Sequence, residues 1–432
     1  MIELRAYHEF FPVGQGLFAF GSVVLKQPKK SKQTLGVRRI KTPSSEQEPD
    51  ESTYRWVYDC GSSTAKRLVS NAIGEVKSKC GDDRIDLLTL SHFHNDHISG
   101  VVEILKRVGA ETVMLPWAPL WHRLAIGYDQ GLQAGDAELE FFVDPVAYLV
   151  EEAGDGFDRV LFVMPSEGDG PPFEPDPIPP EPPREGPDDT EKDDGPGEWA
   201  SWAELEVAGV SREVKKLRPG QSVPAIQGAW EFVPYNDPTT RPADPEGFAA
   251  LVDGYRDQLL YGDEDQRTET LRDLRHHYEV VFGRAAMNDV SLFLYGGAVG
   301  RWTGQGFCSC DCIYHRLVGA CGCWKAHETR GAILFTGDGN LSSAQRWDSL
   351  SRYLDLRRAT RASVLQVPHH GSRANWHDSL ATSALPAISV FSSDPRHSFG
   401  HPHAEVLRDF WAFRPIQVDQ GVGFSVHVAL KR

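Results

Sequence analysis

The sequence predicts an α/β fold in which sheets and helices form a layered sandwich. Strand-like segments come first in a hairpin, at residues 18–25 and 54–58. Helical and strand-like segments then alternate, beginning with a helix at 64–79 and a short apolar strand at 85–90. A hairpin followed by such alternation is typical of a mixed layered sandwich and argues against all-β and all-α folds.

Each element has its own signal in the pattern of apolar residues. In the segment 64–79 they recur at helical spacing, at Leu68, Val69, Ala72, Ile73 and Val76. The later part of the chain repeats the alternation, with strands and helices expected in turn at 332–335, 343–358, 363–367, 376–383 and 387–391. These later strands end in polar clusters, which become candidates for a functional site.

The length of the chain limits its domain organisation. A protein of 432 residues can form two ordinary domains or one large domain that carries insertions. We expect a single domain over residues 1–432. Three insertions interrupt it: a Pro-rich acidic segment at 165–199, a helical segment at 245–283 and a Cys-rich segment at 300–330.

The Pro-rich insertion has an unusual composition. It holds 11 of the 29 prolines and a net charge of −10 out of the −16 of the whole chain. Such a segment cannot bury enough apolar surface to offset the entropy lost on ordering, so we expect it to be disordered on the surface. Its PIPPEPP stretch is compatible with a polyproline II ligand for a protein partner. A solvated linker is the plainer interpretation.

Composition also bears on the surroundings of the protein. No stretch approaches the ~18 apolar residues that span a membrane, and the N-terminus lacks the basic and apolar regions of a secretory signal. The seven cysteines are mostly clustered and do not resemble a disulfide framework. We therefore expect a cytoplasmic protein without membrane association. The net charge weakens the case for tight, non-specific binding of long nucleic acid, although a metal site can supply local positive charge.

A histidine cluster, SHFHNDH at residues 91–97, directly follows the strand expected at 85–90. His92 and His94 are two residues apart, so in an extended segment both project to one side and can bind one metal ion. When the chain turns after His94, Asp96 and His97 face a second metal. Imidazole nitrogen and carboxylate oxygen suit Zn²⁺ or Mn²⁺. A run of surface histidines is the alternative, but clusters at a strand end mark metal or catalytic sites.

Two later strands end in further candidate ligands. The strand at 332–335 runs into Thr336-Gly337-Asp338, where Asp338 is the candidate for a carboxylate that bridges two metals and Gly337 permits a tight turn. The strand at 363–367 runs into His369 and His370. One of this pair should complete the second metal's ligands. We favour His370 as the ligand and His369 as a catalytic residue or a hydrogen-bonding neighbour.

A last pair of histidines lies in Gly400-His401-Pro402-His403. His401, or with less support His403, can donate a proton to a leaving alkoxide or hold a phosphate oxygen. The alternative is an ordinary loop histidine beside a proline.

Together these pieces resemble the metallo-β-lactamase fold superfamily, and within it the branch that contains the hydrolase domain of ComEC-type DNA-uptake proteins. The matching motifs, in chain order, are Val13-Gly14-Gln15-Gly16, Asp59-Cys60-Gly61, the 91–97 cluster, Asn288 with Ser291, Thr336-Gly337-Asp338, His369-His370-Gly371-Ser372 and Gly400-His401-Pro402. The cluster is specific for the superfamily, while the Val-Gly-Gln-Gly and His-His-Gly-Ser motifs narrow the resemblance to the branch.

The resemblance implies an αββα sandwich with two divalent metal ions, zinc or manganese, at one edge of its sheets. It implies a metal-activated water that attacks phosphorus or a carbonyl carbon, with Asp96 aligning the water and His369 or His401 assisting the leaving group. Residues behind or beside the ligands would be Asp59, Asn288, Ser291 and Ser372.

Two departures from the family pattern are visible. Between His97 and Asp338 there is no strand-end histidine to match an additional metal ligand of other superfamily members. The chain also lacks the membrane channel segments of the DNA-uptake proteins, so DNA uptake itself is not predicted.

The Cys-rich insertion carries a possible second kind of metal site. Four of its five cysteines could hold a structural zinc and so stabilise a loop with little core of its own; the five are Cys308, Cys310, Cys312, Cys321 and Cys323. The Cys-x-Cys spacing is tighter than the usual Cys-x-x-Cys knuckle. Free or redox-active thiols are the alternative.

The sequence therefore predicts a metal-dependent hydrolase, most directly a phosphodiesterase or nuclease acting on nucleic acid or nucleotides. The same site chemistry is compatible with a hydrolase of carboxylic esters, lactones or thioesters. A regulatory or scaffold module with a vestigial metal site, binding a partner through its Pro-rich arm, is the alternative from another class.

Overall fold

The computed structural model describes residues 2–28, 50–129, 132–136, 138–166, 204–207, 210–237, 244–282, 291–307 and 331–432. Most of the predicted Pro-rich insertion, and the Cys-rich insertion beyond residue 307, lie outside these residues. Asn288 and all five cysteines of the patch also lie outside them. Among the described residues, no helix is both long and apolar enough to cross a bilayer.

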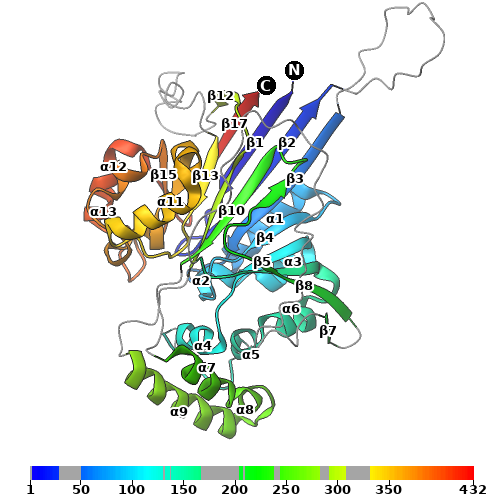
Figure 1. Ribbon diagram of the computed structural model, residues 1–432, viewed down its shortest axis with the longest axis vertical. Coiled ribbons are helices and arrows are strands. Elements are labelled where there is room, and N and C mark those ends of the chain that lie inside the picture. Colours follow the sequence, from blue (N-terminus) through cyan, green and yellow to red (C-terminus); the bar gives the residue numbers. More distant parts are fainter. Residues whose placement is uncertain are drawn as a thin grey trace, which may run out of the picture.

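A ten-stranded sheet contains both termini of the chain (Figure 1). Its strands, in spatial order, are β12 (Thr303–Phe307), β17 (Phe424–Lys431), β1 (Glu3–Phe10), β2 (Phe18–Gln27), β3 (Asp50–Cys60), β4 (Ile85–Thr89), β5 (Ala110–Pro116), β6 (Phe157–Val163), β8 (Val210–Leu217) and β7 (Glu204–Val207). The β1, β2 and β3 strands run antiparallel, whereas β3 to β6 are parallel. The hairpin predicted near the N-terminus thus leads into a parallel half, where β4 delivers the histidine cluster.

A seven-stranded sheet packs against the first. Its strands, in spatial order, are β16 (Pro415–Val418), β15 (Ile388–Ser392), β14 (Ala362–Gln366), β13 (Ala332–Phe335), β11 (Leu292–Ala298), β10 (Trp230–Asn236) and β9 (Val223–Ala225). The run from β13 to β16 is parallel. Because parallel strands end at a common edge, the polar clusters that follow β13, β14 and β15 are brought together there.

Helices cover the outer faces of both sheets (Figure 1). Over the ten-stranded sheet lie α1 (Lys66–Cys80), α3 (Val101–Arg107) and α6 (Pro145–Ala153), and over the other lie α11 (Ala344–Arg361), α12 (Leu380–Ala384) and α13 (Ala404–Asp409). The result is a mixed α/β sandwich with its two sheets in the middle. This agrees with the predicted fold class.

Apolar side chains fill the space between the sheets. Trp56 and Leu87 come from the ten-stranded sheet, and Phe232, Leu294 and Val364 come from the other; all five are buried in one cluster. Alternation along the strands explains this layer, since every second residue points inward. Separate clusters lie under the helices on each outer face. Burial on both faces holds the site-bearing strand ends in fixed positions.

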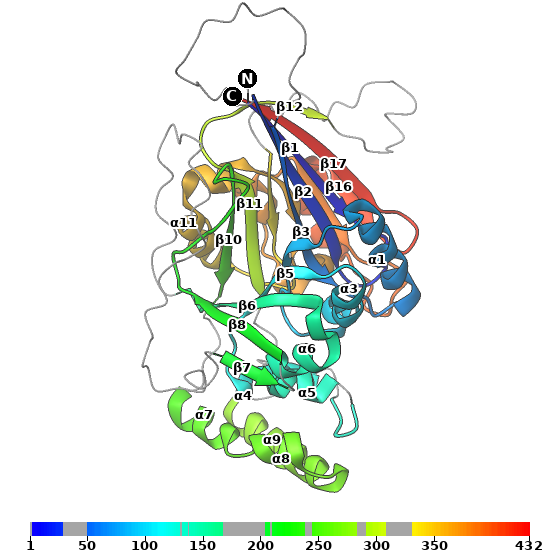
Figure 2. The same cartoon turned by 90° about the vertical axis from the view of Figure 1, so that its right-hand side faces the viewer.

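The segment from 244 to 282 forms three helices at the end of the molecule opposite the termini (Figure 2). They are α7 (Pro245–Asp253), α8 (Arg256–Tyr261) and α9 (Glu264–Phe282), and they pack beside α4 (Leu120–Asp129) and α5 (Glu138–Val143). Asp144, which caps the N-terminus of α6, also accepts a 2.8 Å hydrogen bond from Arg256 at the start of α8. This contact joins the helical segment to the rest of the fold.

Candidate metal centre

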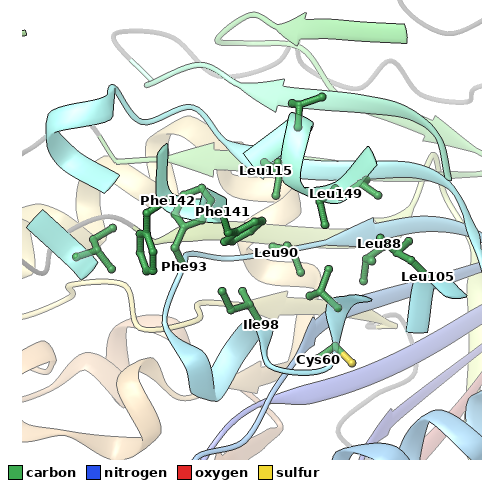
Figure 3. Close-up of a cluster of buried hydrophobic side chains, with 14 of the residues drawn as sticks. Cys60, Leu88, Leu90, Phe93, Ile98, Leu105, Leu115, Phe141, Phe142 and Leu149 are labelled. Carbon is green, nitrogen blue, oxygen red and sulfur yellow. The ribbon is translucent and has the colours of Figure 1, made fainter. Parts of the chain in front are cut away.

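The loop after β4 separates apolar from metal-binding side chains by alternation. Phe93 is buried and points into the apolar cluster, within 5.3 Å of the Phe141 ring centroid (Figure 3). Ile98 enters the same cluster from α2 (Asn95–Ile98) (Figure 3). His92 and His94, on either side of Phe93, face the other way with ring centroids 4.6 Å apart. The core thus anchors the loop while its histidines converge.

The short helix α2 carries Asp96 and His97 around to the same place. Its backbone lies directly against the end of β3: a Cβ atom on Gly61 would come 2.5 Å from the backbone nitrogen of His97. Only glycine fits at this approach. The Asp59-Cys60-Gly61 motif is therefore part of the support for the histidine loop.

A clamp of hydrogen bonds positions Asp338 in the turn after β13. Gln366, the last residue of β14, accepts from the backbone N–H groups of Thr336 and Gly337 at 2.8 and 2.7 Å. Its side-chain amide donates to the carbonyl of Gly337 at 3.2 Å. The backbone N–H of Asp338 itself donates to the Ser291 hydroxyl at 3.1 Å. Thus neighbouring strands determine where this carboxylate points.

Asp338 lies at the centre of the imidazoles. Its Oδ1 is 3.1 Å from His97 Nε2 and 3.5 Å from His370 Nε2. Its Oδ2 is 3.6 Å from His92 Nε2 and 3.6 Å from His369 Nε2. Asp96 Oδ2 lies 3.1 Å from His370 Nε2 on the opposite side.

The tightest arrangements of possible ligands form two groups. One is His92, His94 and Asp338, and the other is Asp96, His97 and His370; within each group the ligand atoms lie within 4.8 Å of one another. His369 is outside both groups as defined by that distance. Asp338 belongs to the first group, and its Oδ1 also faces His97 and His370 of the second. The structure therefore offers two adjacent candidate sites for cations.

Unsatisfied buried atoms show that these groups fit metal ions. The Nε2 atoms of His92, His94 and His97 are buried without a hydrogen-bond partner, and so is Asp338 Oδ1. Buried polar atoms are costly when unpaired, so a whole cluster of them indicates a ligand. With metal bonds of ~2.0–2.1 Å, neighbouring ligand atoms of a tetrahedral shell lie ~3.3 Å apart, close to the separations around Asp338.

Hydrogen bonds on the far side of the rings orient the imidazoles. His97 Nδ1 donates to Asp59 Oδ2 at 2.7 Å, and His370 Nδ1 donates to the Ser392 carbonyl at 2.6 Å. Ser91 Oγ, which donates to Asp59 at 2.7 Å, lies 2.8 Å from His92 Nδ1 and accepts from it. Each bond turns Nε2 of its ring toward the other possible ligands, as in metal-binding histidines. At His370 this Nε2 also forms a hydrogen bond with Asp96 Oδ2 at 3.1 Å, where a metal ion would take the place of the proton.

The charges of the site interact strongly. Burial opposes ionisation of Asp338, but the imidazoles of His369, His97 and His370 outweigh it and hold the pKa of this carboxyl well below its usual range. Burial also lowers the pKa of His92 well below its usual value, and neighbouring His97 adds to this effect. The nearby carboxylates, Asp338 first among them, instead raise the pKa of His97 and of His370. The centre therefore combines an ionised carboxylate and a neutral His92 with two imidazoles from which a bound cation would displace a proton.

His401 lies beside this centre without joining the groups. Its ring centroid is 5.7 Å from that of His369 and 6.3 Å from that of His370, and its Nδ1 is buried without a hydrogen-bond partner. Burial, together with nearby His370 and His369, lowers the pKa of His401 to about 3. His403 instead accepts a hydrogen bond from the backbone of Arg373 at 3.1 Å.

The other predicted neighbours of the ligands differ in what they contact. Asp59 and Ser291 bond to His97 and to the Asp338 backbone, as described above. The Ser372 hydroxyl instead accepts from Ala374 N at 3.3 Å and caps the next turn. Asn288 and the cysteine patch lie outside the described residues.

Several residues of the centre were not singled out from the sequence. Gln366 and Ser91 are two of them, and Asn375 is a third: its amide donates to the Asp338 carbonyl at 2.9 Å while its oxygen accepts from His369 Nδ1 at 2.8 Å. The sequence signal for Gln366 was its position, as a polar residue within the apolar strand expected at 363–367. Asn375 gave no signal, because its contacts depend on a turn between distant strands.

Comparison with known proteins bears on the same part of the chain. The metallo-beta-lactamase superfamily is the family whose model matches, over residues 51–205. Residues 51–205 are thus similar to this superfamily. The match contains Asp59 and the histidine cluster, while Asp338 and His370 follow it in the chain. A search of curated proteins found no match. The superfamily match and the two His/Asp groups together indicate a metal-dependent hydrolase.

Proposed function

We propose that the protein is a metal-dependent phosphodiesterase that hydrolyses nucleic acid or nucleotides at the centre around Asp338. The observation that carries the proposal is that the two oxygens of this carboxylate face different histidines: Oδ1 faces His97 and His370, and Oδ2 faces His92. One carboxylate between two ligand groups is suited to a pair of divalent cations, zinc or manganese. Such a pair, when bound, lowers the pKa of water and stabilises negative charge on the attacked phosphate.

The residues of the chain then have separate tasks. Asp338 separates the two groups and is held by Gln366 and Ser291. Asp96, whose Oδ2 is 3.1 Å from His370 Nε2, is placed to hold and align the attacking water. His401 is close to the ligands and unpaired at Nδ1, and its pKa of about 3 makes it a neutral imidazole that would hold a phosphate oxygen through its N–H.

Two exposed arginines close in sequence to the site histidines are candidates for binding the phosphate of a phosphodiester substrate. Arg373 directly follows the loop of His370, and Arg396 lies on the loop that leads to His401. Their side chains are 67% and 68% exposed, and each also contacts a carboxylate: Arg373 lies 4.0 Å from Glu405, and Arg396 lies 3.3 Å from Asp394. Guanidinium groups recognise phosphate oxygens through paired hydrogen bonds. A carboxylic ester or lactone has no phosphate group that such a guanidinium could bind.

Hydrolysis assays on metal-depleted protein supplied with Mn²⁺, Zn²⁺ or Mg²⁺ test the proposal. Substrates are single- and double-stranded oligonucleotides, bis(p-nitrophenyl) phosphate and p-nitrophenyl acetate. We expect phosphodiester cleavage that Asp96→Ala lowers by about 100-fold or more. The exposed Asp82→Ala is the matched control and should retain full activity. Cleavage of the acetate alone would favour the ester hydrolase, and no cleavage by a metal-loaded protein would favour a binding module.

A further inference from the structure

We propose that His369 is a metal ligand, and that the two consecutive histidines after β14 are divided between the two cations. His370 would serve the cation of Asp96 and His97, and His369 would serve the cation of His92 and His94. The inference deepens the proposed function, because it completes the ligand set of the same centre. His369 would also take the role of the additional metal-ligand histidine, for which the sequence has no strand-end candidate between His97 and Asp338.

The distances around Asp338 support this division. His369 Nε2 and His92 Nε2 lie at the same distance, 3.6 Å, from the same oxygen, Oδ2. This is too long for a hydrogen bond and close to the ~3.3 Å that separates neighbouring ligands of one tetrahedral ion. His370 instead approaches Oδ1, at 3.5 Å, together with His97. Each carboxylate oxygen thus faces two imidazole nitrogens.

The hydrogen bond on the other side of the His369 ring fixes its tautomer. Asn375 must donate through its nitrogen to the Asp338 carbonyl, at 2.9 Å, so its oxygen accepts from His369 Nδ1, at 2.8 Å. Nε2 is then left with a lone pair that faces Asp338. His97 and His370 are held in the same way through Nδ1. His401 has no partner at Nδ1 and does not share this arrangement.

The backbone at His369 and His370 is strained, and this conformation directs both imidazole rings toward Asp338. His369 and His370 have φ angles of 45° and 57°, in the left-handed region that non-glycine residues seldom adopt. Such a conformation costs roughly 1–2 kcal/mol per residue. Backbone strain of this kind clusters at functional sites. Here it brings two adjacent imidazoles to the two oxygens of one carboxylate.

Metal binding itself, rather than activity, tests the assignment. Chelated protein is titrated with Zn²⁺ or Co²⁺ by calorimetry, and bound metal is counted by elemental analysis. We expect two cations in the wild type and, in His369→Asn, one cation at wild-type affinity and a second weakened by about 100-fold or more. The Co²⁺ absorption spectrum should lose the contribution of one nitrogen ligand. His369→Cys, which offers another ligand atom, should recover part of the second site.

His401→Asn is the matched control, because it removes a histidine from the same pocket. It should leave both affinities unchanged. Far-UV circular dichroism of the metal-free variants checks that they fold, and Asn375→Ala provides an independent change that should weaken the same cation about 10- to 100-fold. Two cations bound to His369→Asn as tightly as to the wild type would overturn the inference. A wild type that binds two cations but cleaves no phosphodiester would overturn only the proposed function.

Discussion

Asp59 and His97 form a hydrogen bond of 2.7 Å, between side chains that are both fully excluded from solvent. Asp59 adopts a φ of 55°, and its second oxygen accepts from the backbone N–H of Ser91 at 2.6 Å. The carboxylate therefore ties the end of β3 to the loop after β4. It also fixes which nitrogen of His97 faces the metal centre.

Replacing Asp59 by asparagine should weaken metal binding without removing any ligand. An amide that turns its nitrogen toward His97 would favour the wrong tautomer, and the imidazole would lose a charged acceptor. We expect the cation bound by His97 to be held about 10- to 100-fold less tightly in Asp59→Asn. Titration of chelated protein measures this, with Asp82→Asn as an exposed control. Unchanged affinity would mean that Asp59 serves the fold alone.

The clamp formed by Gln366 should matter for stability as well as for the site. In Gln366→Ala, the buried N–H groups of Thr336 and Gly337 lose their acceptor. Each unpaired buried group costs roughly 1–3 kcal/mol, so the free energy of unfolding should fall by about 2–5 kcal/mol. Gln366→Glu keeps the acceptor but loses the bonds that the amide donates to the carbonyls of Gly337 and Val367, so it should be destabilised because those buried acceptors lose their donor. Urea unfolding of the metal-free proteins compares the two.

On the proposed function, Phe399 would be a surface on which a base of the nucleic-acid substrate stacks. Its side chain is 60% exposed, and its ring lies 5.9 Å from His401 at an interplanar angle of 28°. Stacking of a base contributes roughly 1–3 kcal/mol, so Phe399→Ala should raise KM for an oligonucleotide about 5- to 100-fold. Phe399→Trp should retain a low KM.

Trp411 is the matched control for this change, since it is 72% exposed and lies on the turn after α13. Its replacement by alanine should leave KM unaltered. An oligonucleotide that is abasic beside the cleaved bond should respond little to Phe399→Ala. Equal effects on both substrates would show that Phe399 supports the loop rather than the base.

Because His122 is buried, we expect the protein to lose stability in acid for a reason that is independent of the metal centre. It is buried and stacked on Trp121 at 4.7 Å, and burial lowers its pKa from 6.5 to about 3. The unfolded chain therefore binds a proton below pH 6.5 that the folded chain does not accept until about pH 3. Its contribution is present above pH 6.5 and is lost progressively as the pH falls toward 3.

His122→Phe keeps an aromatic ring and removes this titration. Between pH 7.5 and 5.5, the wild type should lose about 1.4 kcal/mol more stability than the variant. Urea unfolding of metal-free protein at the two pH values measures the difference. Equal losses of stability in the wild type and in His122→Phe would show that a group other than His122 takes up the proton.

Local patterns predicted most of the fold and many candidate ligands. The apolar segment at 85–90 and the alternation around Phe93 are short-range signals, because burial of every second residue is set by the strand itself. Thus the convergence of His92 and His94 could be anticipated from spacing. Helices such as α1 were likewise visible from the recurrence of apolar residues at helical intervals.

Contacts between distant strand ends could not be anticipated in the same way. Gln366 holds the turn before Asp338, although Gln366 ends β14 and Asp338 follows β13. Asn375 joins His369 to the Asp338 backbone through a turn whose path the sequence does not specify. These contacts depend on which strands are neighbours and on their register, and many registers are compatible with one apolar pattern.

The sequence by itself determined the kind of chemistry: histidines and aspartates gathered after apolar strands, in the layered α/β arrangement that brings such ends together. Only the tertiary structure decided how those side chains are shared. It set His97 and His370 against one oxygen of Asp338, and it brought His369 to the other. The physical reason is that His97 follows a strand of one sheet, whereas Asp338, His369 and His370 follow two strands of the other. Their separation is fixed by packing across the buried layer and by backbone strain at a single turn, neither of which is encoded in local spacing.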